Sequence, residues 1–180
     1  MPITKQTNAY TVHRVVISSP KPINAVLRDL NFELNEEKAG IHLMMKLASA
    51  ASREDLETAI NGMTEGKRDF LLFASGSHSR WMEAYSNHQL KFRQTVVYTI
   101  GNPLLAAPVL KNDMTAGLDI PPKLLVQETD NGGTRIIYDL PSSIMAAGAP
   151  RNAEMEAALD KLDKKFELLV NKVLTVANKL

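Results

Sequence analysis

The clearest pattern of apolar and polar positions lies at the end of the chain. Apolar residues recur there at alternating steps of four and three, at Met155, Leu159, Leu162, Phe166, Leu169, Val173, Val176 and Leu180. Such spacing aligns the side chains along one stripe of a helix. It predicts a long helix over residues 152–180. The stripe can cover the protein's own sheet, or it can form a two-helix seam between subunits.

Runs rich in apolar and β-branched residues predict five strands: Tyr10–Ser19, Asp69–Ala74, Leu90–Ile100, Lys123–Glu128 and Thr134–Tyr138. The last two are separated by Asp130, Asn131, Gly132 and Gly133. Because Asn-Gly is the strongest short signal for a hairpin turn, these two strands are expected to pair. Ser75–Ser77 is expected to form a turn.

Helical spacing of apolar residues predicts three helices between the first two strands, over Ile23–Leu30, Asn35–Ala51 and Leu56–Met63. Residues 52–55 approximate a capping box ahead of the third. The first eight residues are expected to be a loose arm.

The segment Gly101-Asn102-Pro103 has the residue types of a helix start, because an asparagine side chain caps free amides and proline fits the first turn. Pro108 predicts that the helix is short or irregular. Asp113–Leu118 is expected to be a turn or a second short helix, and another helix is expected to start near Ser142. The order of elements predicts one α+β domain over residues 1–180, with an antiparallel sheet, helices on one face and a long C-terminal helix.

The composition narrows the possible functions. With 180 residues, 44% of them hydrophobic, the chain can build one domain core. A formal net charge of +1 gives no reason to expect a nucleic acid or a charged membrane as partner. There is no apolar run long enough to span a bilayer, and the first residues lack the apolar core of a signal peptide. A cytoplasmic protein is expected.

Several kinds of catalytic site are missing from the sequence. The chain has no cysteine, which excludes disulfides, thiol catalysis and thiolate metal ligands. It has no phosphate-binding glycine loop and no Gly-x-Ser-x-Gly motif. His78 and His88 lack the spacing of metal ligands. We therefore expect neither a metal nor a cofactor.

The residues left for acid–base chemistry are His78, Asp113, Tyr138 and Arg28. Histidine exchanges protons near neutral pH, a carboxylate can act as a base, and a phenol can donate to an enolate oxygen. A guanidinium group can attract a carboxylate or an enolate. Each residue also has a structural explanation: a surface histidine, a turn cap, packing against the sheet and a solvated side chain, respectively.

Trp81, Asn102, Ser142 and Ser143 are candidates for substrate binding. Trp81, the only tryptophan, can line an apolar pocket, although such a residue more often lies in a core or a dimer interface. Asn102 begins a helix, where free amides can also hold an oxyanion. The simplest role for Asn102, Ser142 and Ser143 is to cap helices.

The chain resembles a known family at Gly101–Ala106, Asp113, Ala116–Leu118 and Tyr138–Ser143. These residues resemble domain-of-unknown-function family three-hundred-two. The resemblance implies, from prokaryotic members, a TATA-binding-protein-like α+β domain that pairs into dimers. The longer form is similar to a fungal branch, which includes a small cofactor-free cyclase that closes the α-pyrone ring of an aurovertin-type polyketide. The fungal relatives have Asn-His before the tryptophan, whereas this chain has Ser77-His78.

The resemblance implies a polyketide cyclase that forms a pyrone by lactonisation in an apolar pocket. In this hypothesis His78 or Asp113 is the base, Arg28 and Tyr138 stabilise the oxyanion, and Trp81 forms part of the wall. Asp113 is preferred over Asp119 and Asp139 because it matches the family motif. The alternative is a non-catalytic dimer that binds a small apolar ligand or a protein partner. Both hypotheses expect a homodimer, and the first expects a small polyketide substrate.

Overall fold

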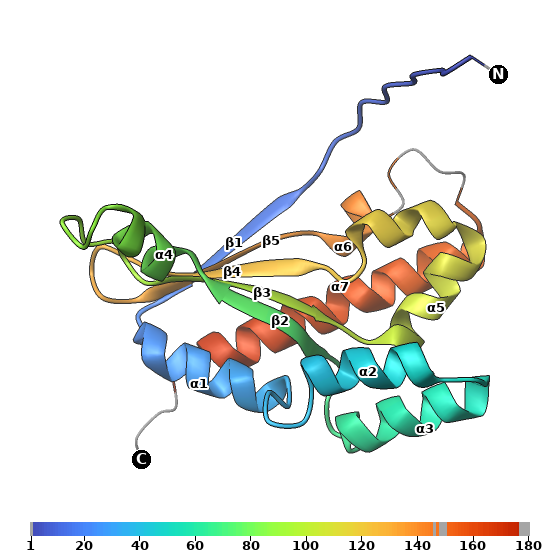
Figure 1. Ribbon diagram of the computed structural model, residues 1–180, viewed down its shortest axis with the longest axis horizontal. Coiled ribbons are helices and arrows are strands. Elements are labelled where there is room, and N and C mark those ends of the chain that lie inside the picture. Colours follow the sequence, from blue (N-terminus) through green and yellow to red (C-terminus); the bar gives the residue numbers. More distant parts are fainter. Residues whose placement is uncertain (1, 146, 148–150, 177–180) are drawn as a thin grey trace.

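The computed structural model describes residues 2–145, 147 and 151–176. Five strands form one antiparallel sheet in the order β1-β5-β4-β3-β2 (Figure 1). Their bounds are Arg14–Ser19 (β1), Leu71–Ser77 (β2), Thr95–Gly101 (β3), Lys123–Glu128 (β4) and Thr134–Asp139 (β5). The helices are Ile23–Glu33 (α1), Ile41–Ser49 (α2), Arg53–Thr64 (α3), His78–Tyr85 (α4), Pro103–Asn112 (α5), the 3-10 helix Met114–Asp119 (η1), Pro141–Ile144 (α6) and Ala153–Leu174 (α7). The predicted fold class is confirmed.

The apolar stripe of α7 lies against the protein's own sheet. Its members from Met155 to Val173 are buried. The ring of Phe166 packs 5.0 Å from the ring of Tyr138 and 5.2 Å from that of Phe70. The interpretation of α7 as a cover for the sheet is therefore confirmed. The same residues cannot also form a seam with a second subunit without unfolding this core.

Helix α7 ends earlier than the sequence predicted. It stops at Leu174, because the backbone of Thr175 is extended. The side chains of Ser19 and Lys21 donate hydrogen bonds to the last carbonyls of the helix, at 2.7 Å and 2.8 Å. Val176, predicted to belong to the stripe, is 51% exposed, and Leu180 lies outside the described residues.

Helix α1 lies beside α7 under the same face of the sheet (Figure 1). Its buried side chains are Ile23, Val26 and Leu30. The phenol of Tyr98, on β3, donates a 2.8 Å hydrogen bond to Asn31 on α1. Burial, with a contribution from Glu36, raises the pKa of Tyr98 to about 12. Its hydroxyl therefore stays a donor at neutral pH and ties the helix to the sheet.

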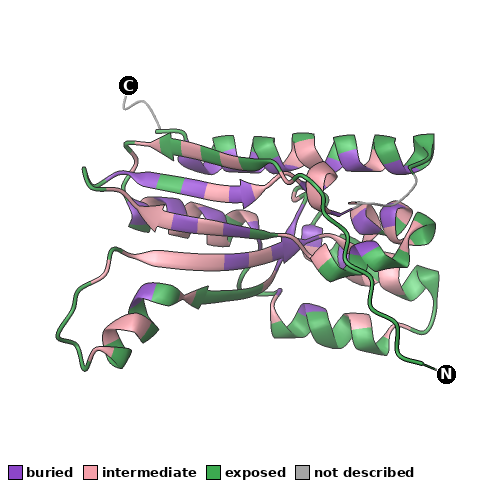
Figure 2. Cartoon of the chain, turned by 90° about the horizontal axis from the view of Figure 1, so that it is seen from above, coloured by how far each residue is buried: buried purple, intermediate pink, exposed green. Residues whose placement is uncertain are grey.

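The other face of the sheet is open. Figure 2 looks onto the strands from above, and no described helix crosses in front of their middle. Residues of β1 alternate between exposed and half-buried, which is the pattern of a strand with one covered and one solvated face.

Three predicted boundaries are wrong between residues 10 and 95. The helix predicted over Asn35–Ala51 begins only at Ile41. Asn35 has a left-handed backbone with φ of 53°, so no helix can run through it. Strand β1 begins at Arg14 rather than Tyr10, and β3 begins at Thr95 rather than Leu90.

Two other local predictions are wrong, and tertiary pairing explains the first of them. Ser75–Ser77 was expected to be a turn but is strand, because it pairs with β3 over Val96–Tyr98. Helix α5 was expected to be short or irregular at Pro108. It runs through this proline as one helix of ten residues, Pro103–Asn112, and Asn112 donates a 2.7 Å hydrogen bond to the Pro108 carbonyl.

We predict that Gly133→Ala destabilises the protein whereas Gly62→Ala does not. A Cβ atom at Gly133 would lie 2.5 Å from the carbonyl oxygen of Ser19, so the backbone would have to move. We expect a loss of about 1–3 kcal/mol in the free energy of unfolding, measured by urea denaturation. A Cβ atom at Gly62, within α3, meets nothing within 4 Å, and we expect a gain of about 0.5–1 kcal/mol there. Equal stability of the two variants would contradict the packing of the β4–β5 turn against β1.

Candidate functional site

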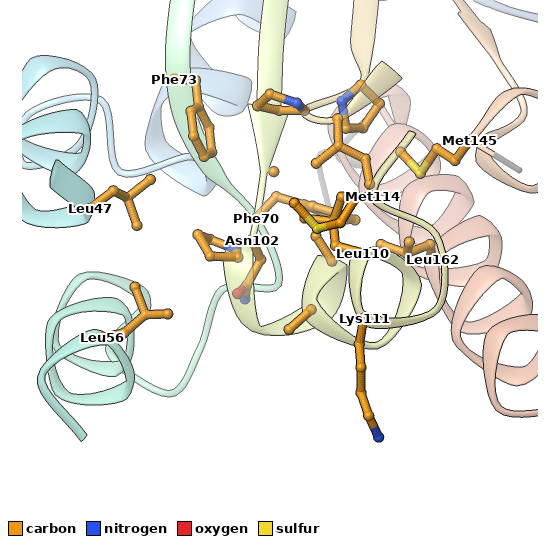
Figure 3. Close-up of a pocket in the computed structure, with 17 residues that line it drawn as sticks. Leu47, Leu56, Phe70, Phe73, Asn102, Leu110, Lys111, Met114, Met145 and Leu162 are labelled. Carbon is orange, nitrogen blue, oxygen red and sulfur yellow. The ribbon is translucent and has the colours of Figure 1, made fainter. Parts of the chain in front are cut away.

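An apolar cavity of about 470 Å³ lies where β3 ends and α5 begins (Figure 3). Its walls come from α2, α3, β2, α5, η1, the loop before β4 and α7. The lining residues are Leu47, Leu56, Phe70, Phe73, Gly101, Asn102, Pro103, Ala106, Ala107, Leu110, Lys111, Met114, Ile120, Pro121, Pro122, Met145 and Leu162.

Gly101 sits where the backbone of β3 passes closest to two walls of the cavity. A Cβ atom on it would lie 3.1 Å from the Cβ of Pro121 and 3.3 Å from Cε2 of Phe73. These distances are shorter than ordinary van der Waals contact. The sequence Gly-Asn-Pro thus leaves room for the two walls to meet here and starts α5 directly afterwards.

The α2 and α3 side of the cavity is formed by Leu47 and Leu56. Figure 3 shows their side chains projecting from α2 and α3 toward the start of α5. Both are half-buried. On the opposite side lie Met145 and Leu162, which are buried. The cavity therefore separates the α2–α3 pair from the α5–α7 side of the protein.

Asn102 is a helix cap, as one interpretation of the sequence predicted. Its Oδ1 accepts a 2.9 Å hydrogen bond from the Leu104 amide, and its Nδ2 donates a 3.0 Å hydrogen bond to the Asp69 carbonyl. The amides of Leu105 and Ala106 bond to the carbonyl of Asn102. Because these groups are all used, the start of α5 offers no ready donor to an oxyanion.

Lys111 contributes its aliphatic stem to the lining. Figure 3 shows its ammonium group directed away from the cavity. The side chain is 73% exposed and lies 3.4 Å from a carboxylate oxygen of Glu154, which is also exposed. Such an exposed pair contributes little to stability, so the ammonium is free to move. The interior of the cavity carries no charge.

Asp113 lies next to the cavity but does not line it. It caps η1, because its Oδ1 accepts hydrogen bonds from the amide and the hydroxyl of Thr115, at 2.9 Å and 2.7 Å. These bonds lower the pKa of Asp113, the hydroxyl having the larger effect. The predicted turn cap is confirmed, and the lowered pKa makes this carboxylate a weaker base. Its neighbour Met114 lines the cavity.

His78 and Trp81 lie at the other end of the sheet. His78 follows the end of β2 whereas Asn102 follows the end of β3, and these strands are antiparallel. Figure 1 accordingly shows α4 and α5 at opposite ends. The indole Nε1 of Trp81 donates a 3.0 Å hydrogen bond to Nδ1 of His78. Trp81 is 56% exposed, so the interpretation as a core residue is wrong.

Tyr138 and Arg28 are also absent from the cavity lining. Tyr138 is 3% exposed and lies under α7, where burial, followed by Glu167 and Asp163, raises the pKa of its phenol. Arg28 is exposed on α1 and forms an ion pair with Asp29. The structure therefore does not bring His78, Asp113 and Tyr138 together around one hollow.

The two serines of α6 have structural partners. Ser143 Oγ accepts a 3.0 Å hydrogen bond from the amide of His13 and donates to the carbonyl of Leu140. The amide of Ser142 donates to Asp163 on α7. Neither serine lines the cavity. Their contacts hold α6 between the N-terminal segment and α7.

Asp119, for which the sequence offered no family match, lies at the C-terminal end of η1. This residue lines a second hollow of about 230 Å³, which shares Pro121 and Pro122 with the main cavity. Burial raises the pKa of the Asp119 carboxyl, and Lys123 partly opposes this shift. The sequence feature that could have pointed to Asp119 is its position directly before Ile120-Pro121-Pro122, because this rigid segment fixes the backbone beside the carboxyl. Leu47 and Leu56 were missed as lining residues because they lie far from Gly101 in the sequence.

No group of three or more His, Asp and Glu residues within the described ranges could hold a metal ion. None of the described helices has the length and apolar character needed to cross a membrane.

Comparisons with known proteins agree with this fold. A search of curated proteins found no match. Among solved structures, the chain is similar to the crystal structure of an uncharacterized conserved protein DUF302 from Bacillus stearothermophilus, with a TM-score of 0.60 and 16% identity. The match covers 90% of this chain and 98% of that one. The family model "Domain of unknown function DUF302" matches residues 45–172, which is most of the chain. The protein therefore belongs to the DUF302 family.

Proposed function

We propose that the protein binds a small, largely apolar molecule in the cavity beside Gly101. The observation that carries this proposal is the uncharged, apolar lining of a space of about 470 Å³. Pockets that hold small molecules typically measure about 300–1,000 Å³ and are lined mainly by apolar side chains. The proposal corresponds to the non-catalytic alternative predicted from the sequence, and it assigns the ligand to this cavity.

The lining also limits which parts of a ligand can be charged or polar. A charged group inside the cavity would lose its hydration without gaining a partner, which is costly. The apolar part of the ligand therefore lies against Leu47, Leu56 and Leu110. A polar end is placed at the rim, where the ammonium of Lys111 is exposed and can turn toward it.

A second candidate function is the pyrone-forming lactonisation of a polyketide. It is supported by the resemblance to the fungal cyclases and by two carboxyls at the ends of η1, Asp113 and Asp119. Asp119 has the raised pKa that suits proton exchange nearer neutral pH. In this proposal Asp119 replaces His78 as the base. His78, Tyr138 and Arg28 then have no direct role, because none of them lines either hollow.

The lactonisation requires few catalytic groups. The carboxylate takes a proton from an activated carbon or enol of a poly-β-keto chain. The enol oxygen then bonds to the terminal carbonyl carbon, and a thiol or water leaves with the proton. Holding the chain folded so that these atoms meet supplies much of the acceleration. The apolar cavity would hold the chain, with its reacting end near Pro121.

We predict that Leu56→Asp weakens binding of an apolar dye, such as anilinonaphthalene sulfonate, by at least about tenfold, because it places a charge in the apolar wall. The measurement is dye fluorescence titration, with circular dichroism to establish the fold. Leu168→Asp is the matched control, since Leu168 is exposed on α7 and lines no described part of the cavity. Equal affinities of the two variants would rule out this cavity as the ligand site.

Loss of both residues of the α4 pair, in His78→Ala/Trp81→Ala, should leave dye affinity unchanged within about twofold. The pair lies at the opposite end of the sheet from Gly101 and is exposed. Its removal should also change the free energy of unfolding by less than about 0.5 kcal/mol, since surface substitutions rarely do more. A clear fall in affinity at unchanged stability would place the ligand near α4 instead.

The cyclase candidate predicts that the protein accelerates lactonisation of a synthetic β,δ-diketo thioester over the buffer rate, followed by absorbance of the pyrone. Asp119→Asn should then lower the rate by about 10²–10⁴-fold, the usual contribution of an acid–base group. Asp113→Asn should have a smaller effect, and Asp160→Asn, exposed on α7, should have none. If the wild-type protein gives no acceleration while it still binds the dye, the cyclase candidate fails and the binding function stands.

A further inference from the structure

Helices α2 and α3 form a hairpin, residues 41–64, whose two ends are fixed close together. The amide of Gly40, directly before α2, donates a 2.8 Å hydrogen bond to the carbonyl of Leu72 on β2. Lys38, before α2, and Glu65, after α3, form a 2.8 Å ion pair that joins the two ends. Figure 1 shows the connection between the two helices at the end away from β2. We call the fixed ends the base of the hairpin.

The apolar packing of the hairpin is concentrated at the base. Leu43, in the first turn of α2, and Ile60, one turn before the end of α3, are fully buried. Nearer the tip, which is residues 50–52, Leu47 and Leu56 are only half-buried and project into the cavity (Figure 3). The half of the hairpin next to the tip therefore lies over a hollow instead of a packed core.

Polar contacts do not hold this half against the rest of the described protein. The hydrogen bonds and ion pairs of residues 41–62 all join members of the stretch 40–65, as the ion pair of Arg53 with Glu57 does. Apolar contact has no preferred direction. The hairpin can therefore turn on its packed base without breaking a hydrogen bond.

Both connections to the hairpin contain a glycine with a left-handed backbone. Gly40 has φ of 62° and ψ of −123°, a combination that residues with a side chain rarely adopt. Glu65 and Gly66 follow α3 with φ of 53° and 63°. A Cβ atom on either glycine would meet nothing within 4 Å, so neighbouring atoms do not block a change of the backbone there. Hinges consist of such residues, at the ends of elements, that absorb changes in φ and ψ.

We propose that the α2–α3 hairpin is a lid that pivots at Gly40 and Gly66 and closes over an apolar molecule in the cavity. The inference rests on the proposed ligand site beside Gly101. Closing removes the remaining exposed surface of Leu47 and Leu56 from water against the ligand, so a bound ligand favours the closed position. Because α3 rises about 1.5 Å per residue over twelve residues, a rotation of about 10° at its base moves the tip by about 3 Å.

The lid also defines the route by which a ligand enters. Figure 3 shows Met114 and Lys111 across the cavity from Leu47 and Leu56. Met114 and Lys111 line the cavity and are exposed at the surface, so the gap between them and the hairpin already reaches solvent. Opening the lid widens this gap. The apolar part of the ligand enters first, and its polar end stays beside the Lys111 ammonium.

The first arm of the test uses the ligand-free protein. Because the chain has no cysteine, spin labels can be placed at chosen positions by substitution to cysteine. Double electron–electron resonance then measures the distance from Asp160→Cys, on α7, to Ala51→Cys at the tip or to Lys67→Cys beyond the base. All three positions are exposed. The tip pair should give the broader distance distribution, and equal widths would overturn the lid.

In the second arm, anilinonaphthalene sulfonate is added until its fluorescence saturates. The distance from Ala51 to Asp160 should shift by more than about 2 Å, the scale of rearrangements on binding, and its distribution should narrow. Thr58→Cys, midway along α3, should shift less and Lys67→Cys not at all, because displacement grows with distance from a hinge. Equal shifts at the three positions would overturn the pivot, as would a shift at Ala51 alone, which indicates fraying of the tip.

The outcomes separate the lid from the ligand site. Dye binding that depends on Leu56, with no change in any distance, overturns the lid and leaves the binding proposal standing. If the dye gives no binding signal, the ligand site fails, and closure over a ligand fails with it. The first arm then still reports whether the hairpin moves.

Discussion

The packing of α7 against the sheet is the interaction on which the rest of the structure depends. Phe166 lies between Tyr138 of β5 and Phe70 ahead of β2, so one side chain joins two distant parts of the sheet. Burial of each large apolar side chain contributes about 1.5–3 kcal/mol, and most of the stripe is fully buried. This interaction makes Tyr138 a core residue rather than a proton donor. It also leaves the opposite face of the sheet without a cover.

A second constraint comes from the antiparallel pairing of β2 and β3. Because His78 follows the end of β2 and Asn102 follows the end of β3, the two residues lie at opposite ends of the sheet. These two candidate site residues are therefore far apart in space. The apolar cavity forms at the Asn102 end, where α5 and η1 meet the α2–α3 pair. The ligand proposed for this cavity would contact the groups at that end, chiefly apolar walls with Lys111 and Asp119 nearby.

The cavity and the open face have different physical causes. The cavity exists because Gly101 lets Phe73 and Pro121 approach while Leu47 and Leu56 remain across a gap. The open face exists because α1 and α7 both pack under one side of a five-stranded sheet (Figure 2). The cavity and the open face therefore lie in different parts of the molecule.

The sequence by itself determined the features that depend on neighbours along the chain. The period of the α7 stripe, the Asn-Gly hairpin turn, and the caps at Asn102 and Asp113 were all predicted, because helix faces, turns and caps follow from local geometry. Only the tertiary structure decided which elements meet. The sequence could not place Leu56 opposite Leu110, or separate His78 from Asp113, because a periodic pattern reports which face of an element is apolar but not which other element will cover it.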